Sequence, residues 1–174
     1  ITQSGTNVMI ISTTIITNST LVGNSAVYFG GGICNYYSYY AEATVTNSTL
    51  AGNSAGHSGG GIFNDSTATL NLFNSLLGEN TAASGPDLGN DGGTITAQYN
   101  LIQDGTGSGI THGVDGNQVG VDPLLDPAGL DDHGGPTHTI ALLPGSPAID
   151  AGSNAAAAGL QYDQRGEPFA RIYG

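Results

Sequence analysis

Aspartates are the main candidates for a chemical role in the last third of the chain. Hard oxygen ligands, such as carboxylates and the backbone carbonyls of Gly- and Pro-rich loops, suit Ca²⁺. A cation would also relieve the mutual repulsion of these carboxylates. The sequence therefore predicts a calcium site here, and the alternative is that these residues form Asx turns and carry solvated charge. The candidate ligands are Asp104, Asp115, Asp122, Asp126, Asp131, Asp132 and Asp150.

Histidine offers a second possible metal ligand. Zinc and copper sites usually need two or more imidazoles close together, and the spacing of these histidines does not by itself bring them together. We interpret them as structural or solvent-exposed side chains. The histidines are His57, His112, His133 and His138.

Four tyrosines in the run "YYSYY" could recognise a ligand. Exposed tyrosine rings stack on sugar faces and donate hydrogen bonds, and the same rings can pack against a neighbouring subunit. The sequence predicts a glycan or subunit contact at this run, or a loop that covers the flank of the fold. The residues are Tyr36, Tyr37, Tyr39 and Tyr40.

Charge excludes several classes of partner. The formal net charge is −12, with 14 Asp and Glu against two Arg and no Lys. Nucleic acids and anionic membrane surfaces bind basic patches, so neither is an expected partner. We also expect no membrane span, because no apolar stretch is long enough. The lone cysteine, Cys34, cannot form an intrachain disulfide, and we expect it to be a small buried residue.

Internal repeats indicate what positions these side chains. The segment "TNSTLVGNSA" at 17–26 returns as "TNSTLAGNSA" at 46–55, and "GGGICN" at 30–35 returns as "GGGIFN" at 59–64. Between them lie short runs rich in Thr, Val and Ile, which are too short and too β-branched for helices. Repeats of this length point to a solenoid of stacked turns.

Asparagine marks three columns in these repeats. The first column is Asn18, Asn47, Asn74 and Asn100; the second is Asn24, Asn53 and Asn80; the third is Asn35, Asn64 and Asn90. Asn at the same corner of successive turns can stack its amides in a ladder. Three short strands and three corners per repeat predict an all-β fold, a right-handed, three-sided parallel β-helix of about four coils. We assign the coils to residues 1–103 and an acidic, Gly/Pro/Asp-rich segment that packs along or caps the stack to 104–174.

The repeat unit, Asn-Ser-Thr-Leu, Gly-Asn-Ser-Ala and Gly-Gly-Gly-Ile-x-Asn, resembles bacterial extracellular right-handed β-helix repeats of the polymorphic outer-membrane protein type. The tail, with "HGGPTHTIALLPGSPAIDAG" and "DQRGEP", resembles the choice-of-anchor Q domain. Together the resemblances cover about 13–168. They imply secretion and display on a bacterial cell surface, and they imply no catalytic residues.

Polysaccharide cleavage is the enzymatic alternative, because parallel β-helices often carry such sites. A lyase needs a base, often Lys or Arg, and both arginines of this Lys-free chain, Arg165 and Arg171, lie near its end. A hydrolase needs two carboxylates on either side of one bond. The sequence therefore predicts a non-enzymatic protein, and a lyase or hydrolase is the less favoured alternative.

The first predicted coil has an unguarded edge. Residues 7–17, "NVMIISTTIIT", are apolar, β-prone and free of charge, which is the composition of a strand that pairs with another chain. We expect copies of the protein to stack head to tail through this edge into an extracellular fibre. Bound cations would add to the stability of that fibre. The alternative is a monomeric cell-surface adhesin or glycan-binding passenger domain. The start and end of the sequence favour a processed product or a fragment.

Overall fold

Strands make up nearly all the regular structure of the chain. The computed structural model describes residues 12–36 and 41–171. Within those ranges the helical structure is one short 3₁₀ helix, η1 (Val114–Gly116). None of the described residues belongs to a helix with the length and apolar character needed to cross a bilayer. The predicted all-β class is confirmed.

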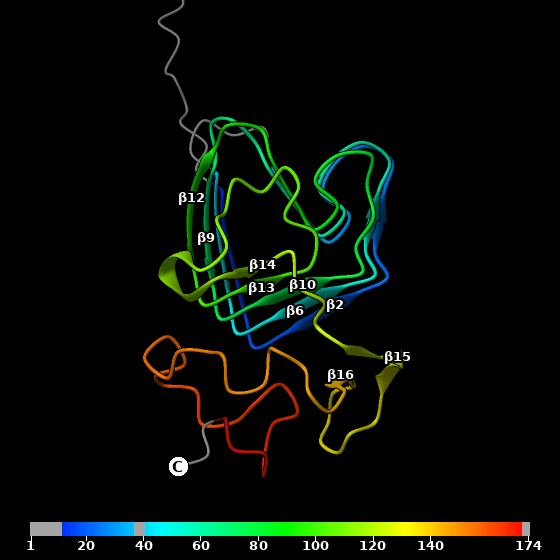
Figure 1. Ribbon diagram of the computed structural model, residues 1–174, viewed down its shortest axis with the longest axis vertical. Helices are drawn as coiled ribbons and strands as arrows, with labels where there is room; N and C mark the ends of the chain where they lie inside the picture. Colours follow the sequence, from blue (N-terminus) through cyan, green and yellow to red (C-terminus); the bar gives the residue numbers. More distant parts are fainter. Residues whose placement is uncertain (1–11, 37–40, 172–174) are drawn as a thin grey trace, which may run out of the picture.

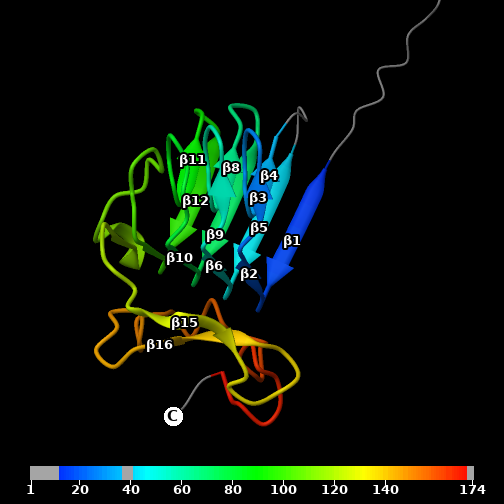
Figure 2. The ribbon, with the colours of Figure 1, turned by 90° about the vertical axis from the view of Figure 1, so that its right-hand side faces the viewer.

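The repeats form parallel sheets that run the length of a solenoid (Figures 1 and 2). The first sheet contains β1 (Thr13–Thr17), β5 (Glu42–Thr46), β9 (Thr69–Phe73) and β12 (Thr94–Gln98). The second contains β2 (Thr20–Val22), β6 (Thr49–Ala51), β10 (Leu76–Gly78), β13 (Leu101–Ile102) and β14 (Gln118–Val119). The third contains β4 (Ile33–Asn35), β8 (Ile62–Asn64) and β11 (Leu88–Asn90), and β3 (Ser25–Ala26) pairs with β7 (Ser54–Ala55).

Each strand pairs with the strand one repeat later, so one repeat closes one turn. In the first sheet Thr17 lies beside Thr46, and Phe73 lies beside Gln98. The solenoid has about three turns, since β12 and β13 begin a fourth turn that the chain leaves after Ile102. The predicted parallel β-helix is therefore confirmed, with about three turns rather than four.

Apolar side chains that point inward from the three sheets form one continuous core. They alternate along the strands with outward side chains, as the period of a β-strand requires. The largest fully buried members are Val45, Leu50, Ile62, Leu70, Leu72, Leu77, Leu88 and Ile102.

The repeated Gly-Gly-Gly segment lets neighbouring turns approach without side chains. A Cβ atom on Gly31 would lie 2.3 Å from the carbonyl oxygen of Ser54, and one on Gly60 would lie 2.5 Å from that of Thr81. No side chain fits at such distances, so the sequence keeps glycine at this corner.

The residues that follow the repeats form two parts, which we name the end cap (104–119) and the side segment (125–171). The end cap covers the last turn, where the amide of Asn90 donates to the carbonyl of Gly107 at 3.0 Å. The side segment contains the antiparallel pair β15 (Leu125–Asp131) and β16 (Thr139–Leu142). Figure 2 shows that it lies along the flank of the stack, below the strands, and not across its end.

The first turn lies at one end of the described stack. Strand β1 pairs with β5, and none of the described residues forms a strand on its other side. Three large apolar side chains of this turn are exposed, Ile15 at 72%, Val27 at 78% and Tyr28 at 70%. Figure 2 shows β1 as the outermost strand at one end of the stack.

Candidate functional site

The second asparagine column is a ladder of side-chain amides, of which those of Asn53 and Asn80 are buried. The Nδ2 of Asn24 donates to Oδ1 of Asn53 at 3.0 Å, and the Nδ2 of Asn53 donates to Oδ1 of Asn80 at 2.9 Å. Each Oδ1 also accepts the backbone N–H of the preceding asparagine. These side chains therefore satisfy backbone groups at a corner where the strands stop.

The third column forms a similar ladder. The Nδ2 of Asn35 donates to Oδ1 of Asn64 at 2.8 Å, and that of Asn64 donates to Oδ1 of Asn90 at 3.0 Å. Asn64 is fully buried. Both ladders hold one turn to the next, which is a structural role.

The first column differs from the sequence-based prediction at its fourth position. Asn18, Asn47 and Asn74 adopt left-handed backbone angles, with φ of 54°, 53° and 49°, and the next residue to do so at this corner is Tyr99, with φ of 56°. Asn100, predicted to belong to this column, lies one position further along. The prediction was wrong there because the last repeat is one residue shorter than the asparagine spacing implied.

Asn100 instead continues a column of serines. The backbone N–H of Ser48 donates to Oγ of Ser75, and that of Ser75 donates to Oδ1 of Asn100 at 2.9 Å. The Nδ2 of Asn100 donates in turn to Oδ1 of Asn117 at 2.9 Å. Asn117 therefore ties the end cap to the last turn, and sequence reasoning missed it because the repeat has ended by that point.

The side segment docks on the first column. The Nδ2 of Asn18 donates to the carbonyl of Asp163 at 2.9 Å, and the Nδ2 of Asn74 donates to that of Ser153 at 2.8 Å. A guanidinium nitrogen of Arg171 donates to Oδ1 of Asn47 at 2.9 Å. One face of the asparagine column thus binds backbone and side-chain groups of a segment far away in the sequence.

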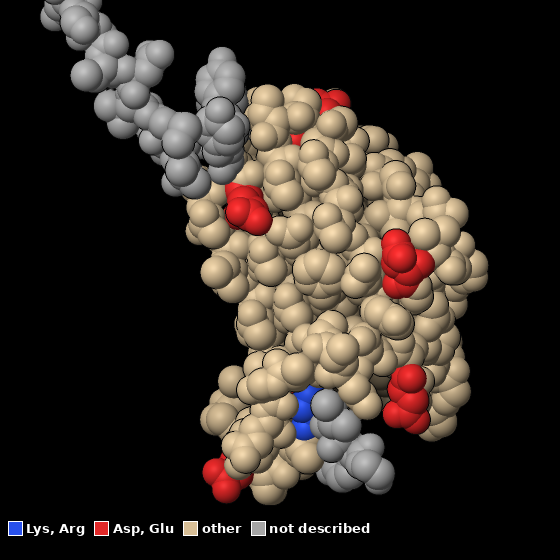
Figure 3. Space-filling view, turned by 90° about the vertical axis from the view of Figure 1, so that its left-hand side faces the viewer, with Lys and Arg blue, Asp and Glu red and all other residues tan. Residues whose placement is uncertain are grey.

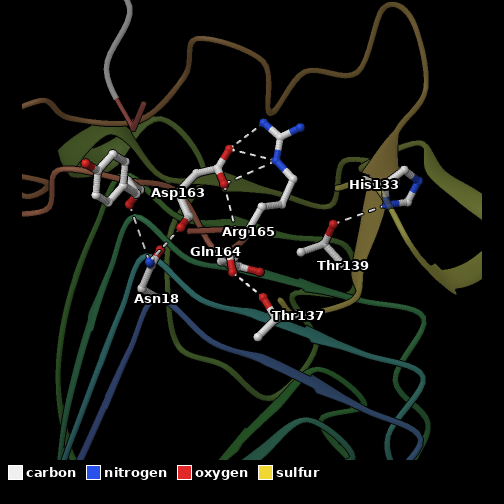
Figure 4. Close-up of polar contacts among 8 residues, drawn as sticks. Asn18, His133, Thr137, Thr139, Asp163, Gln164 and Arg165 are labelled. Atoms are coloured by element: carbon white, nitrogen blue, oxygen red, sulfur yellow. Dashed lines mark hydrogen bonds and ion pairs between the residues drawn. The ribbon is translucent and has the colours of Figure 1, made fainter. Parts of the chain in front are cut away.

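Charged side chains of the side segment contact one another beside this docking site (Figure 4). The carboxylate of Asp163 forms an ion pair with Arg165 at 2.6 Å, and the guanidinium of Arg165 lies 3.9 Å from the ring centroid of Phe169. Figure 4 shows Asn18 directed at the backbone of Asp163, and it shows His133 hydrogen-bonded to Thr139 on the neighbouring strand. Burial lowers the pKa of the Arg171 guanidinium, and the charge of Asp163 opposes that shift.

One carboxylate is buried where the end cap meets the solenoid. Asp87 is 1% exposed, and its two oxygens accept hydrogen bonds from Nδ2 of Asn80 and from the backbone N–H of Asp104, each at 2.7 Å. Burial raises the pKa of this carboxyl, and the nearby charge of Asp104 raises it further, while the hydrogen bonds act in the opposite direction. Asp87 thus links the second ladder to the end cap.

The seven aspartates proposed as calcium ligands are spread along the C-terminal part. Among the described residues no three His, Cys, Asp or Glu side chains lie close enough together to hold a metal ion. Asp104, Asp122, Asp126 and Asp132 each accept the backbone N–H two residues later. Figure 3 shows the acidic side chains of one face as separate spots, not as one patch. Calcium binding stays a prediction, which thermal melts with and without a chelator would test.

The proposed tyrosine contact is described at one residue. Tyr36 is 41% exposed and its ring stacks on that of Phe29, with centroids 5.7 Å apart, while Phe29 stacks on Phe63 at 4.6 Å. These rings form a column on the outside of the third sheet. Tyr37, Tyr39 and Tyr40 lie outside the described residues.

Cys34 shares the outer face of this sheet. It is exposed, contrary to the prediction that it is buried, because its neighbours Ile33 and Asn35 both point inward in β4. Partial burial raises the pKa of its thiol, and the charge of Asp65 adds to the effect.

Comparison with known proteins gives no family for this chain. Protein-family models, curated proteins and solved structures were compared with it, and none of them matches. The observed parallel β-solenoid agrees with the fold that the resemblance implied. The resemblance to polymorphic outer-membrane protein repeats and to the choice-of-anchor Q domain stays a hypothesis.

A polar groove lies between the side segment and the last two turns. Its volume is about 540 Å³. Tyr99 and Gln118 line it from the end of the solenoid, and Asp150 and Asn154 line it from the side segment. Arg171 lies where the groove meets the first asparagine column.

Proposed function

We propose that the chain is a non-enzymatic structural module of a bacterial extracellular or cell-surface protein, and that a second copy docks on the open edge of its first turn. The observation that supports this proposal most directly is the pairing of β1 with a strand on one side alone within the described residues. The polar side chains that recur from turn to turn hold the turns together, which is the expected use of side chains in a scaffold.

The backbone of β1 offers hydrogen bonds to a docking strand. The amide of Asn18 donates to the carbonyl of Thr46, and the carbonyl of Ser12 accepts from the amide of Glu42. In a strand, backbone groups of alternate residues point to opposite sides. The groups of Thr13, Ile15 and Thr17 therefore point away from β5, and a strand that docked there would satisfy them.

The chain itself provides the surface that fits this edge. Around a two-fold axis the first turn of one copy meets the first turn of the other, so the same edge provides both sides of the contact. The exposed side chains of Ile15, Val27 and Tyr28 would become buried on docking. These features favour a second copy over an unrelated partner.

The end cap decides between a closed pair and a fibre. Head-to-tail stacking, the arrangement expected from the sequence, needs an open last turn. The amide of Asn90 there is already bonded to Gly107, and that of Tyr99 is bonded to Asp115 at 2.9 Å. These contacts favour an edge-to-edge pair, which is closed by two-fold symmetry, over a continuous fibre.

Analytical ultracentrifugation over a wide concentration range, together with negative-stain microscopy, tests the proposal. We expect a dimer that Ile15→Lys weakens by roughly tenfold or more, because a lysine on an edge opposes strand pairing. Val114→Lys is the control, since Val114 is 52% exposed on the end cap. Filaments that both substitutions disrupt would support head-to-tail stacking instead. A wild-type monomer at all concentrations would refute the proposal.

A further inference from the structure

The groove between the side segment and the last turns has the dimensions of a ligand site. Its volume of about 540 Å³ lies within the range of small-molecule sites, roughly 300–1,000 Å³. It is far from the first-turn edge in the fold, because Tyr99 and Gln118 belong to the opposite end of the stack (Figure 2). An inference about it therefore goes beyond the proposed function and does not depend on it.

Tyr99 is an unusual residue for its place in the wall of this groove. It has φ of 56°, at the corner where the three earlier turns have asparagine. Asparagine tolerates left-handed backbone angles far better than tyrosine does, so tyrosine at this position carries a conformational cost. Such strain at a cavity wall often marks a functional residue.

The ring of Tyr99 packs against the end cap. A Cβ atom on Gly116 would lie 2.5 Å from Cδ1 of Tyr99, so the ring packs directly on the glycine backbone of the end cap. The residue is nevertheless 42% exposed. The end-cap backbone thus supports part of the ring, and part of the side chain remains accessible from the groove that it lines.

The polar side chains around Tyr99 combine donors and acceptors. Asp150 and Asn154 are exposed, and their side chains form no hydrogen bond within the part of the chain that the structure describes. The Nε2 of Gln118 donates to the carbonyl of Pro147 at 2.9 Å, and its Oε1 can still accept. Arg171 adds a guanidinium group, one N–H of which donates a hydrogen bond to Asn47.

We infer that this groove binds a neutral carbohydrate, a mono- or disaccharide unit of a glycan, with Tyr99 as the surface on which the sugar ring stacks. Sugar hydroxyls both donate and accept hydrogen bonds, so they match the carboxylate of Asp150, the amides of Asn154 and Gln118, and the guanidinium of Arg171. An aromatic ring with an accessible face contributes apolar stacking. The net charge of −12 disfavours polyanionic glycans.

The test uses the whole chain on an array of immobilised neutral glycans built from hexoses and N-acetylhexosamines, with uronic-acid glycans on the same array. Two variants remove groove groups without disturbing the backbone. Tyr99→Asn installs the residue found at this corner in the earlier turns, and Asp150→Asn suits its left-handed φ of 57°. Gln161→Ala, at an exposed glutamine of the side segment that does not line the groove, is the control.

We expect the wild type to bind at least one neutral glycan and both groove variants to bind it at least about tenfold more weakly, which is the loss of about one well-placed contact. Thermal melts should show that both variants fold, and Gln161→Ala should bind as the wild type does. Silence on the array, binding of uronic-acid glycans alone, or full binding by folded Tyr99→Asn would overturn the inference. Loss of binding in Gln161→Ala would also overturn it.

Discussion

Asn53 and Asn80, which are one repeat apart, are joined by two hydrogen bonds inside the solenoid. The backbone N–H and the Nδ2 of Asn53 both donate to Oδ1 of Asn80 at 2.9 Å. The Nδ2 of Asn53 also donates to the carbonyl of Leu21 at 3.0 Å, and its Oδ1 accepts two hydrogen bonds from Asn24. A single buried side chain thus connects three successive turns.

Replacing Asn53 should therefore destabilise the fold strongly. Asn53→Ala removes the partner of the backbone N–H of Asn24 and of the carbonyl of Leu21, both in partly buried hydrogen bonds, which should cost about 2–4 kcal/mol in the free energy of unfolding. Asn53→Asp keeps the side-chain volume but replaces the Nδ2 donor with a carboxylate oxygen, so it should lower the free energy of unfolding by at least as much. Urea unfolding measures both values. Asn154→Ala, at an exposed asparagine, should change the free energy by no more than about 0.5 kcal/mol. Similar stability of Asn53→Ala and Asn154→Ala would contradict a role for the ladder.

Substitutions at two glycines test separately how a steric clash and a left-handed backbone angle affect stability. A Cβ atom on Gly60 would lie 2.5 Å from the carbonyl oxygen of Thr81, whereas one on Gly52 would have nothing within 4 Å, although Gly52 has φ of +61°. Gly60→Ala should destabilise by more than about 3 kcal/mol or prevent folding, because turns must move apart. Gly52→Ala should cost only about 1–2 kcal/mol, the penalty of the left-handed angle. Thermal and urea unfolding measure both. Equal losses of stability in the two variants would show that a local backbone shift relieves the clash at Gly60.

The repeats made most of the solenoid predictable from sequence. Asparagines 29 residues apart, such as Asn24 and Asn53, share a ladder because one repeat is one turn. The alternation in β4 also contained the information that places Cys34 outside, since Ile33 and Asn35 must both point inward. The fold and the second and third ladders followed from periodicity alone.

Periodicity could not place the features that lie beyond it. The corner at Tyr99 was missed because the repeat shortens there and asparagine is absent from the corner itself. The docking of Asn18 on Asp163 joins residues 145 apart, and nothing in the side segment repeats to reveal the contact. The groove depends on the same docking, so only three-dimensional structure shows it.

Gln164 should hold the side segment on the solenoid. Its Nε2 donates to the carbonyl of Asn47 at 3.0 Å, and its Oε1 accepts a hydrogen bond from the hydroxyl of Thr20. Gln164→Ala should cost about 1–2 kcal/mol and should make the side segment more sensitive to proteolysis than the strands are. Limited proteolysis with mass spectrometry, together with urea unfolding, measures both effects.

The matched control for Gln164 is Gln161→Ala, at an exposed glutamine three residues earlier in the same segment. It should leave both the free energy of unfolding and the cleavage pattern unchanged. If Gln164→Ala were cleaved no faster than Gln161→Ala, other contacts, such as that of Asn74 with Ser153, would be sufficient to hold the segment.

Asp87 should give the stability of the fold a measurable dependence on pH. Burial raises the pKa of its carboxyl above the ordinary 3.8, and the charge of Asp104 adds to this. A raised pKa means that the folded state holds the proton more tightly, so the contribution of Asp87 is greatest below pH 3.8 and declines as pH rises through the folded-state pKa. The free energy of unfolding of the wild type minus that of Asp87→Asn should therefore decrease from acidic to neutral pH. The changed hydrogen bonds to Asn80 add a constant to this difference in the free energy of unfolding, and that constant does not vary with pH. Urea unfolding of both proteins from acidic to neutral pH therefore measures the effect of the Asp87 carboxyl titration alone. A difference that rises with pH would mean that the hydrogen bonds to the carboxylate outweigh its burial.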